Sequence, residues 1–243
     1  MVKGFRTNNC RKIVDCRRLF GKIAFKGVGT VKQILLHGLG QTAASWEKTI
    51  SHMDQRLDII CPNLSDFLHG KEKSYINLYT SFAEYCKDLP EPLNLCGLSL
   101  GGIIALHYGI ENPSKVNSLV LIGTQFTMPQ GLLKFQNVIF RFLPKRLFKS
   151  IGFEKGDMIN LTSSMMDLDF QPDLKTLTCP VLVVCGEKDK ANKGASLQLK
   201  AQIPQAEIVL IEKAGHEVNR DAPEILGRVL NDFYLKVAQT TGE

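Results

Sequence analysis

Short apolar runs alternate with segments of helical periodicity along most of the chain. Runs of this length bounded by Gly or Pro are typical of buried strands, and they lie at 32–38, 57–62, 93–98, 116–123, 179–187 and 206–212. Apolar residues at helical spacing occupy 43–53, 77–89, 101–110, 195–203 and 223–237. This alternation predicts an α/β fold with a mostly parallel, doubly wound sheet of about eight strands and helices on both faces.

Two segments interrupt the alternation. Residues 18–27, RLFGKIAFKG, suggest part of an antiparallel hairpin at a sheet edge, where charged side chains are common. Residues 124–175 form an insertion, and the stretch 131–153 predicts two short helices separated at Pro144, apolar on more than one face. Long insertions in compact domains often carry function, so we interpret this one as a helical lid within a single domain spanning 1–243.

Charge is unevenly distributed along the 243 residues, whose net charge is +6. Residues 1–30 hold eight basic residues and one acidic residue, so the other 213 carry 22 − 23 = −1. The basic character therefore belongs to the N-terminal segment, and the body gives no reason to expect a nucleic-acid partner. With 44% hydrophobic and 22% charged residues, the composition excludes a disordered chain, a collagen and a disulfide mini-domain.

The N-terminal sequence and the cysteines indicate the cellular compartment in which we expect the protein. Charges interrupt each early apolar run, so we expect no secretory signal, and no apolar run approaches the roughly 18 residues of a membrane span. The seven cysteines are scattered and include no CxxC pair, which argues against a disulfide framework or zinc site. A reducing compartment, most simply the cytoplasm, fits this pattern.

The strongest chemical signal is Gly97-Leu98-Ser99-Leu100-Gly101, between a predicted strand and a predicted helix. A G-x-S-x-G in that context is a nucleophile elbow, which exposes the serine on a sharp turn and requires small neighbours. The turn also places the N–H of Leu100 at a helix N-terminus, where it faces a developing anion. The competing interpretation is a glycine-rich turn with an accidental serine.

A serine needs a base, and the base needs an orienting acid. In this architecture the order along the chain is Ser, acid, His. His216 lies in the loop after the last predicted strand, and Asp189 lies in the turn after the preceding one, with Glu187 as a competitor and a simple turn residue as the alternative. Weaker candidates are His107 in mid-helix, His52 and His69 before Ser99, and Asp157, Asp167 and Asp169 inside the insertion.

The loop His37-Gly38-Leu39-Gly40 follows the first predicted strand. In folds with a nucleophile elbow this loop supplies the second oxyanion donor, which we assign to the backbone N–H of Leu39. We expect His37 to be structural, bonding the loop. Trp46, at the start of the next helix, suits either a pocket wall or core packing.

Together, "LLHGLGQTAASW", "CGLSLGGIIALHY", "VLVVCGEKD" and "KAGHEVNRDAPE" resemble the α/β-hydrolase superfamily. The likeness is greatest to small single-domain esterases and lyases with a lid between strands six and seven, and it runs from about 33 to 234, apart from the insertion. It implies Ser99 as nucleophile, Asp189 as acid, His216 as base, and the Leu39 and Leu100 amides as oxyanion donors. One departure is the loop 61–70, "CPNLSDFLHG", where such proteins often have D-x-P-G-x-G.

These features predict a serine hydrolase that cleaves carboxylic esters through an acyl-enzyme, with no metal or organic cofactor. The Phe-rich insertion favours a small apolar acyl or aromatic ester as substrate. Its basic side attracts a carboxylated substrate or an anionic surface, or is simply solvated. Two alternatives remain open: a lyase or carbon–carbon bond hydrolase with the same triad, and a non-catalytic ligand-binding receptor.

Overall fold

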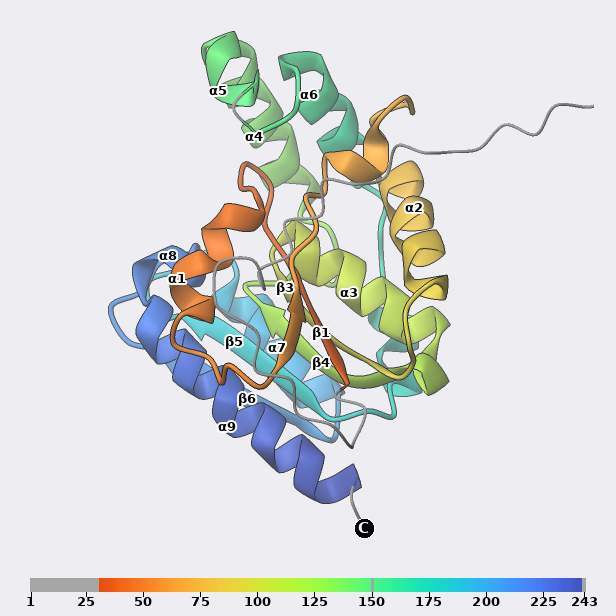
Figure 1. Ribbon diagram of the computed structural model, residues 1–243. Coiled ribbons are helices and arrows are strands. Elements are labelled where there is room, and N and C mark those ends of the chain that lie inside the picture. The colour runs from red at the N-terminus through yellow and green to blue at the C-terminus, as the bar shows by residue number, and fades with distance from the viewer. Residues whose placement is uncertain (1–30, 150, 242–243) are drawn as a thin grey trace, which may run out of the picture.

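A six-stranded parallel sheet forms the centre of the computed structural model, which describes residues 31–149 and 151–241 (Figure 1). The strand order is β2-β1-β3-β4-β5-β6. Each apolar run forms a strand, as predicted from the sequence. The strands are β1 (Lys32–Leu36), β2 (Asp58–Ile60), β3 (Leu93–Leu98), β4 (Val116–Ile122), β5 (Val181–Gly186) and β6 (Ala206–Ile211).

The strand count differs from the prediction of about eight. Six strands lie among the described residues, and the expected N-terminal hairpin falls within residues 1–30, outside that part of the chain. The six strands are parallel, so their carboxyl ends share one edge of the sheet. Ligand sites of open α/β sheets form at that edge.

Helices cover both faces of the sheet. One face packs against α2, α3 and α7, and the other packs against α1 and α9. The helices outside the insertion are α1 (Glu47–Ile50), α2 (Tyr75–Lys87), α3 (Leu100–Glu111), α7 (Lys193–Gln202), α8 (Val218–Asp221) and α9 (Pro223–Thr241). Short 3-10 turns are η2 (Ala43–Trp46), η3 (Asp66–Leu68) and η4 (Pro113–Lys115).

The helix α2 illustrates how the sequence directs these elements. Ser74 precedes it and accepts a hydrogen bond from the backbone N–H of Asn77 at 3.4 Å. Such a cap satisfies one of the N–H groups that a helix leaves unpaired at its start. Leu78, Phe82 and Cys86 recur every four residues and are fully buried against the sheet. The periodicity read from the sequence therefore predicts the buried face correctly.

The insertion between β4 and β5 contains three helices and one 3-10 segment: α4 (Gln130–Phe142), α5 (Lys145–Lys149), α6 (Lys155–Ser163) and η5 (Gln171–Thr176). The predicted break at Pro144 separates α4 from α5. The third helix, α6, was not predicted, because KGDMINLTS lacks a clear apolar stripe. Phe148 and Phe153 are buried in the core, whereas Phe142 is 84% exposed.

A short antiparallel bridge closes the base of the insertion. It pairs Thr127 with Asp169, and the Phe170 N–H donates to the Phe126 carbonyl at 2.8 Å. The insertion thus leaves and rejoins the sheet at neighbouring points. Of the helices in the described ranges, none combines the length and apolar character that a bilayer crossing requires.

The cysteines of the described residues are buried and form no disulfide with one another: Cys61, Cys86, Cys96, Cys179 and Cys185. Burial raises the pKa of the Cys179 thiol to about 11 and that of Cys86 to about 12. Thiols with such values are poor nucleophiles at neutral pH, so these side chains act as small apolar groups in the core.

Candidate active site

Ser99 occupies the sharp turn between β3 and α3. Its backbone has φ 53° and ψ −114°, which costs a non-glycine residue about 1–3 kcal/mol. Two hydrogen bonds hold it there: the Ser99 N–H donates to the Ile122 carbonyl at 2.8 Å, and the Ser99 carbonyl accepts from the Ile103 N–H at 2.9 Å. Strain of this kind persists where the surroundings impose it, and it clusters at active sites.

The turn is possible because the strand and helix approach very closely. A Cβ atom at Gly97 would lie 2.2 Å from the carbonyl oxygen of Gly101, so only glycine fits there. This explains the glycines of the G-x-S-x-G pattern in physical terms. Leu100 is the first residue of α3, and its N–H therefore has no partner within the helix.

His216 and Asp189 meet at the same edge of the sheet. The carboxylate oxygen Oδ2 of Asp189 lies 2.7 Å from Nδ1 of His216, across 27 residues of sequence. Asp189 follows β5 and is only 6% exposed, whereas the side chain of His216, after β6, is 39% exposed. The acid is thus shielded from water while the imidazole remains accessible.

Asn192 completes this arrangement, and the sequence analysis missed it. Its Nδ2 lies 2.9 Å from both carboxylate oxygens of Asp189, and its side-chain oxygen accepts from Gln125 Nε2 at 2.9 Å. The same Nδ2 lies 3.1 Å from His216 Nδ1. The amide nitrogen Nδ2 of Asn192 can donate hydrogen bonds but not accept them, and Nδ1 of His216 already donates to Asp189. The 3.1 Å approach between these two nitrogens is therefore a contact between two donors and not a hydrogen bond. The spacing Asp189-x-x-Asn192 was the available signal.

The hydrogen bonds set both the tautomer and the charge of the pair. With Nδ1–H donating to Asp189, a neutral His216 keeps its Nε2 lone pair free to accept a proton. Burial alone raises the pKa of the Asp189 carboxyl, but the hydrogen bonds from His216 and Asn192 outweigh it and hold the pKa below the ordinary value of 3.8. Asp189 is therefore an ionised acceptor throughout the neutral range.

The ionised form of Asp189 also stabilises the fold, with a definite pH dependence. Because its pKa is lowered in the folded state, the stabilisation is complete above the unfolded value and is lost as pH falls through the folded value. We expect the difference in Tm between the native protein and Asp189→Asn to stay constant above about pH 5 and to shrink below it. Thermal melts from neutral pH to about pH 3 measure this; a difference that grows toward acid would contradict it.

Gly123 connects Ser99 to the His216–Asp189 pair. It directly follows Ile122, whose carbonyl holds the Ser99 N–H, and it has φ +53°. A Cβ atom on Gly123 would lie 3.1 Å from His216 Nδ1 and 3.2 Å from Asp189 Oδ2. Ile122, which holds Ser99, is therefore followed directly by Gly123, which borders the His216–Asp189 pair. This places Ser99 and the pair in one region of the molecule.

Gly123→Ala should consequently impair the site without unfolding the protein. The new methyl group presses on His216 and Asp189 and sits on a backbone that disfavours alanine. Contacts of 3.1 and 3.2 Å require the pair to move by a few tenths of an ångström. Because a misplacement of about 1 Å costs roughly 100-fold in rate, we expect kcat for a short ester to fall about fivefold to tenfold. Gly194→Ala is the control, since its Cβ would meet nothing within 4 Å; equal activity of the two variants would refute the expectation.

The loop after β1 lies against the Ser99 turn. A Cβ on Gly38 would lie 3.6 Å from the Cβ of Ser99, so the backbone of this loop borders the serine. His37 fixes the loop: its Nδ1–H donates to the Gly38 carbonyl at 2.9 Å, and its Nε2 accepts from the Leu64 N–H at 3.0 Å. Burial lowers the pKa of His37 to about 4, so the ring is neutral and structural, as expected.

A second buried connection links this loop to the His216 loop. The side-chain amides of Gln41 and Asn219 exchange hydrogen bonds at 3.2 and 3.1 Å, and both side chains are almost fully buried. Gln41 Oε1 also accepts from the Gly38 N–H at 3.4 Å. This pair fixes the candidate oxyanion loop to the segment that follows His216. The local sequence pattern did not predict this contact.

The weaker candidates have structural roles. His107 stacks on Tyr79, with ring centroids 3.7 Å apart, and its Nε2 lies 3.3 Å from Glu111 Oε1. His52 and His69 are exposed, and Trp46 is fully buried in the core, which makes it a packing residue. The remaining acids accept hydrogen bonds away from His216: Glu187 from the Lys213 N–H, Asp157 from the Glu154 N–H, Asp167 from Gln130, and Asp169 from the Gln171 N–H.

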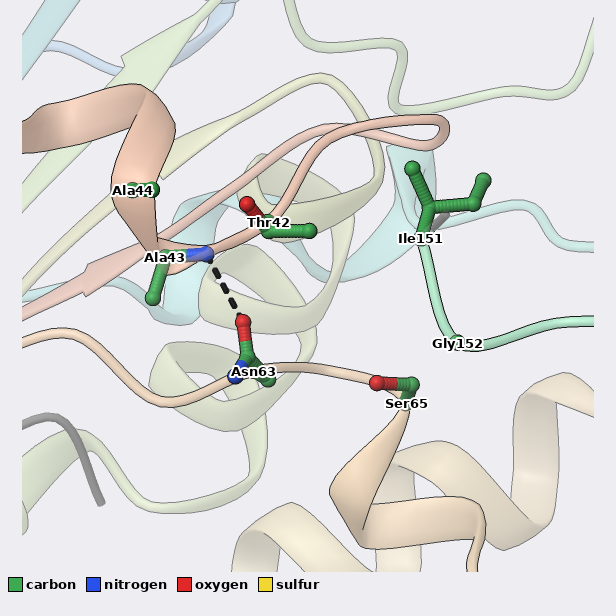
Figure 2. A pocket seen from close by; sticks show the side chains of 7 residues that line it. All are labelled: Thr42, Ala43, Ala44, Asn63, Ser65, Ile151 and Gly152. Atoms are coloured by element: carbon green, nitrogen blue, oxygen red, sulfur yellow. Dashed lines mark hydrogen bonds between the residues drawn. The ribbon is translucent and has the colours of Figure 1, made fainter. Parts of the chain in front are cut away.

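A pocket of about 330 Å³ opens where the loops after β1 and β2 face the insertion, as Figure 2 shows. Its wall combines small apolar and uncharged polar side chains: Thr42, Ala43, Ala44, Asn63, Ser65, Ile151 and Gly152. Asn63 Oδ1 accepts from the Ala43 N–H at 2.8 Å and so ties two of the three segments together. The loop 61–70, whose sequence differs from the D-x-P-G-x-G of similar proteins, therefore contributes residues to the wall of this pocket. Among the described residues, no cluster of His, Cys, Asp and Glu is arranged to hold a metal ion.

Known proteins resemble the chain over most of its length. A profile described as the alpha/beta hydrolase family matches residues 33–228. A Bacillus subtilis protein with the provisional name 2-succinyl-6-hydroxy-2,4-cyclohexadiene-1-carboxylate synthase is 25% identical, over 84% of this chain and 90% of its own. The pimeloyl-(acyl-carrier protein) methyl ester esterase of Vibrio campbellii is 28% identical, over 75% and 86%.

Solved structures share the fold. A structure from work on carboxylesterases of Nitrososphaera gargenis superposes with a TM-score of 0.74 at 17% identity, covering 87% of this chain and 92% of its own. At that level of identity the likeness concerns the fold alone. The relatives include enzymes named as hydrolases and esterases.

Proposed function

Because the chain belongs to the alpha/beta hydrolase family, we propose that it is a serine esterase that cleaves carboxylic ester bonds through Ser99. The observation that carries the proposal is the 2.7 Å hydrogen bond between His216 and Asp189 at the sheet edge where Ser99 occupies its strained turn. A receptor that merely binds ligands needs neither a strained serine nor an oriented imidazole. Both features favour an enzyme.

In the proposed reaction, Nε2 of His216 takes the proton from the Ser99 hydroxyl as the oxygen attacks the ester carbonyl carbon. The backbone N–H groups of Leu39 and Leu100 stabilise the resulting oxyanion, each by about 3 kcal/mol. The intermediate collapses, and the alcohol leaves with the proton from His216. Water, deprotonated by His216, then hydrolyses the acyl-enzyme and regenerates Ser99. Asp189 stabilises the imidazolium at each step.

The test is labelling by a fluorophosphonate probe together with turnover of p-nitrophenyl esters. An activated Ser99 forms a covalent adduct with the probe, and mass spectrometry of the peptide containing Ser99 identifies the site. We expect labelling to stop when Ser99 is replaced. A protein that hydrolyses esters without labelling at Ser99, or that does neither, would contradict the proposal.

We further propose that the pocket between Thr42, Asn63 and Ile151 accepts one side of the ester. Its apolar wall suits a small acyl or aromatic group, and its hydroxyl and amide groups suit one uncharged polar substituent. No charged side chain lines it, so an anionic group has no counter-charge there.

Replacing Ser65 by Val tests this assignment. The change removes a hydroxyl from the pocket wall, and an unmade hydrogen bond to an uncharged group costs about 0.5–1.5 kcal/mol. We expect KM for a hydroxylated ester to rise about 3- to 10-fold, while KM for the matching alkyl ester stays constant. A parallel rise for both esters would indicate general damage rather than loss of a specific contact.

A second reaction class deserves a direct comparison. The Bacillus subtilis relative is named as a synthase and not as an esterase, which favours testing lyase and carbon–carbon bond cleavage with the same residues. Turnover of esters, thioesters and vinylogous diketones, compared as kcat/KM, separates these activities. The esterase proposal predicts the highest value for an oxygen ester.

A further inference from the structure

The helix α4 presents an unusual face to solvent. Val138, Ile139 and Phe142 are 48%, 41% and 84% exposed. At 100° per residue, Lys134, Val138, Arg141 and Phe142 fall within an arc of about 100°, so basic and apolar side chains share one face. Leu133 and Asn137, which fall outside this arc, are buried. An exposed cluster of large apolar side chains on a soluble body usually marks an interaction surface.

The charged residues of the segment that forms this face are of one sign. Residues 124–153 contain five basic residues and no acidic one: Lys134, Arg141, Lys145, Arg146 and Lys149. Within the described part of the chain, no ion pair engages Lys134, Arg141, Arg146 or Lys149. In Figure 1, α4 and α5 project beyond the sheet, on the side opposite α9. The basic and apolar groups thus occur on a protruding part of the molecule.

We propose that this α4–α5 face docks on the surface of a membrane that contains anionic lipids. A helix that carries Phe and aliphatic side chains beside Lys and Arg lies in the headgroup layer, with its apolar side chains below the phosphates and its cations beside them. Phe142 stands at the last position of α4, two residues before Pro144, and is largely exposed. A protein partner would need a matching pocket for such a side chain, whereas a lipid layer deforms around it. The inference is independent of the esterase proposal.

Co-sedimentation of the full chain with vesicles tests the inference. Vesicles of phosphatidylcholine alone are compared with vesicles of equal parts phosphatidylcholine and phosphatidylglycerol, at about 0.1 M and 0.5 M salt. We expect a partition coefficient at least about tenfold higher for the anionic vesicles at low salt, falling at high salt because the charges are screened. Equal binding to both vesicle types, or no binding to either, would overturn the proposal.

Variants locate the surface. Lys134→Gln with Arg141→Gln should lower the partition coefficient about 25-fold, because each basic residue near an anionic surface contributes roughly fivefold. Phe142→Ser should lower it about tenfold by removing apolar burial. The matched controls are Lys48→Gln with Lys175→Gln, and Leu235→Ser, which alter exposed residues on α1, η5 and α9.

These controls should leave the partition coefficient unchanged, and circular dichroism melts should match for all variants, which alter exposed side chains only. Two results would refute the assignment. One is that control and α4 variants lose binding equally. The other is that neither the native protein nor any variant binds anionic vesicles, while the α4 changes abolish a different interaction. That interaction would be self-association in sedimentation velocity, or binding to an acidic polypeptide such as polyglutamate.

Discussion

Ser99→Ala should reduce ester turnover by at least about 10⁴-fold while leaving the fold intact. In the proposed mechanism the Ser99 hydroxyl forms the acyl-enzyme, and alanine removes that hydroxyl without adding bulk. Hydrolysis of p-nitrophenyl acetate under saturating conditions, corrected for the spontaneous rate, measures the loss. Unchanged turnover would exclude Ser99 as the nucleophile and with it the proposed mechanism.

A companion substitution separates chemistry from backbone strain. Ser99→Gly is equally devoid of a nucleophile, yet glycine adopts φ 53° freely, whereas alanine keeps the penalty that serine bears. Urea unfolding should therefore show Ser99→Gly to be more stable than Ser99→Ala by about 1 kcal/mol. Equal stabilities would mean that the turn relaxes on substitution and stores no strain.

Asp189→Asn should lower kcat by about 10⁴-fold with little change in structure. An asparagine at this position has one oxygen and one NH₂ group, but both carboxylate oxygens of Asp189 accept hydrogen bonds from Asn192 or His216. Whichever way the new amide is turned, it places a donor against Asn192 or against His216 Nδ1. In the second case the imidazole carries its proton on Nε2 and no longer accepts the serine proton.

Steady-state kinetics should show this effect mainly in kcat, because Asp189 lies behind His216 and does not contact the pocket lined by Thr42 and Ile151. Asp66→Asn provides the matched control, since Asp66 is an exposed acid in η3. Comparable losses in the two variants would contradict a specific role for Asp189.

The sheet and its helices were predictable because each is governed by local periodicity. The six apolar runs became β1 to β6, and Leu78, Phe82 and Cys86 turned inward as their spacing required. The expected residues at the site were also brought together in part: His216 bonds Asp189. Chain order and parallel strands suffice for that step, because strand ends share one edge.

Long-range contacts between loops were not predictable from local pattern. Gln125 binds Asn192 across 67 residues of sequence, and Gly123, which follows an ordinary buried strand, borders His216. The exposure of Phe142 likewise depends on where the insertion packs. The sequence shows that this side chain is apolar, but it does not show which residues would cover it. Such positions are set by tertiary packing, which leaves no periodic trace.

The reciprocal amide bonds between Gln41 and Asn219 have a consequence for biosynthesis. The two residues are 178 positions apart, so the loop beside Ser99 is translated long before its buried partner exists. At about 5–20 residues per second, that interval lasts roughly 10–35 s. From the synthesis of Ser99 until that of Asn219, the nascent chain carries the serine without part of its surroundings. The proposed ester hydrolysis should therefore begin only after Asn219 has been made, so activity would report chains that extend at least that far.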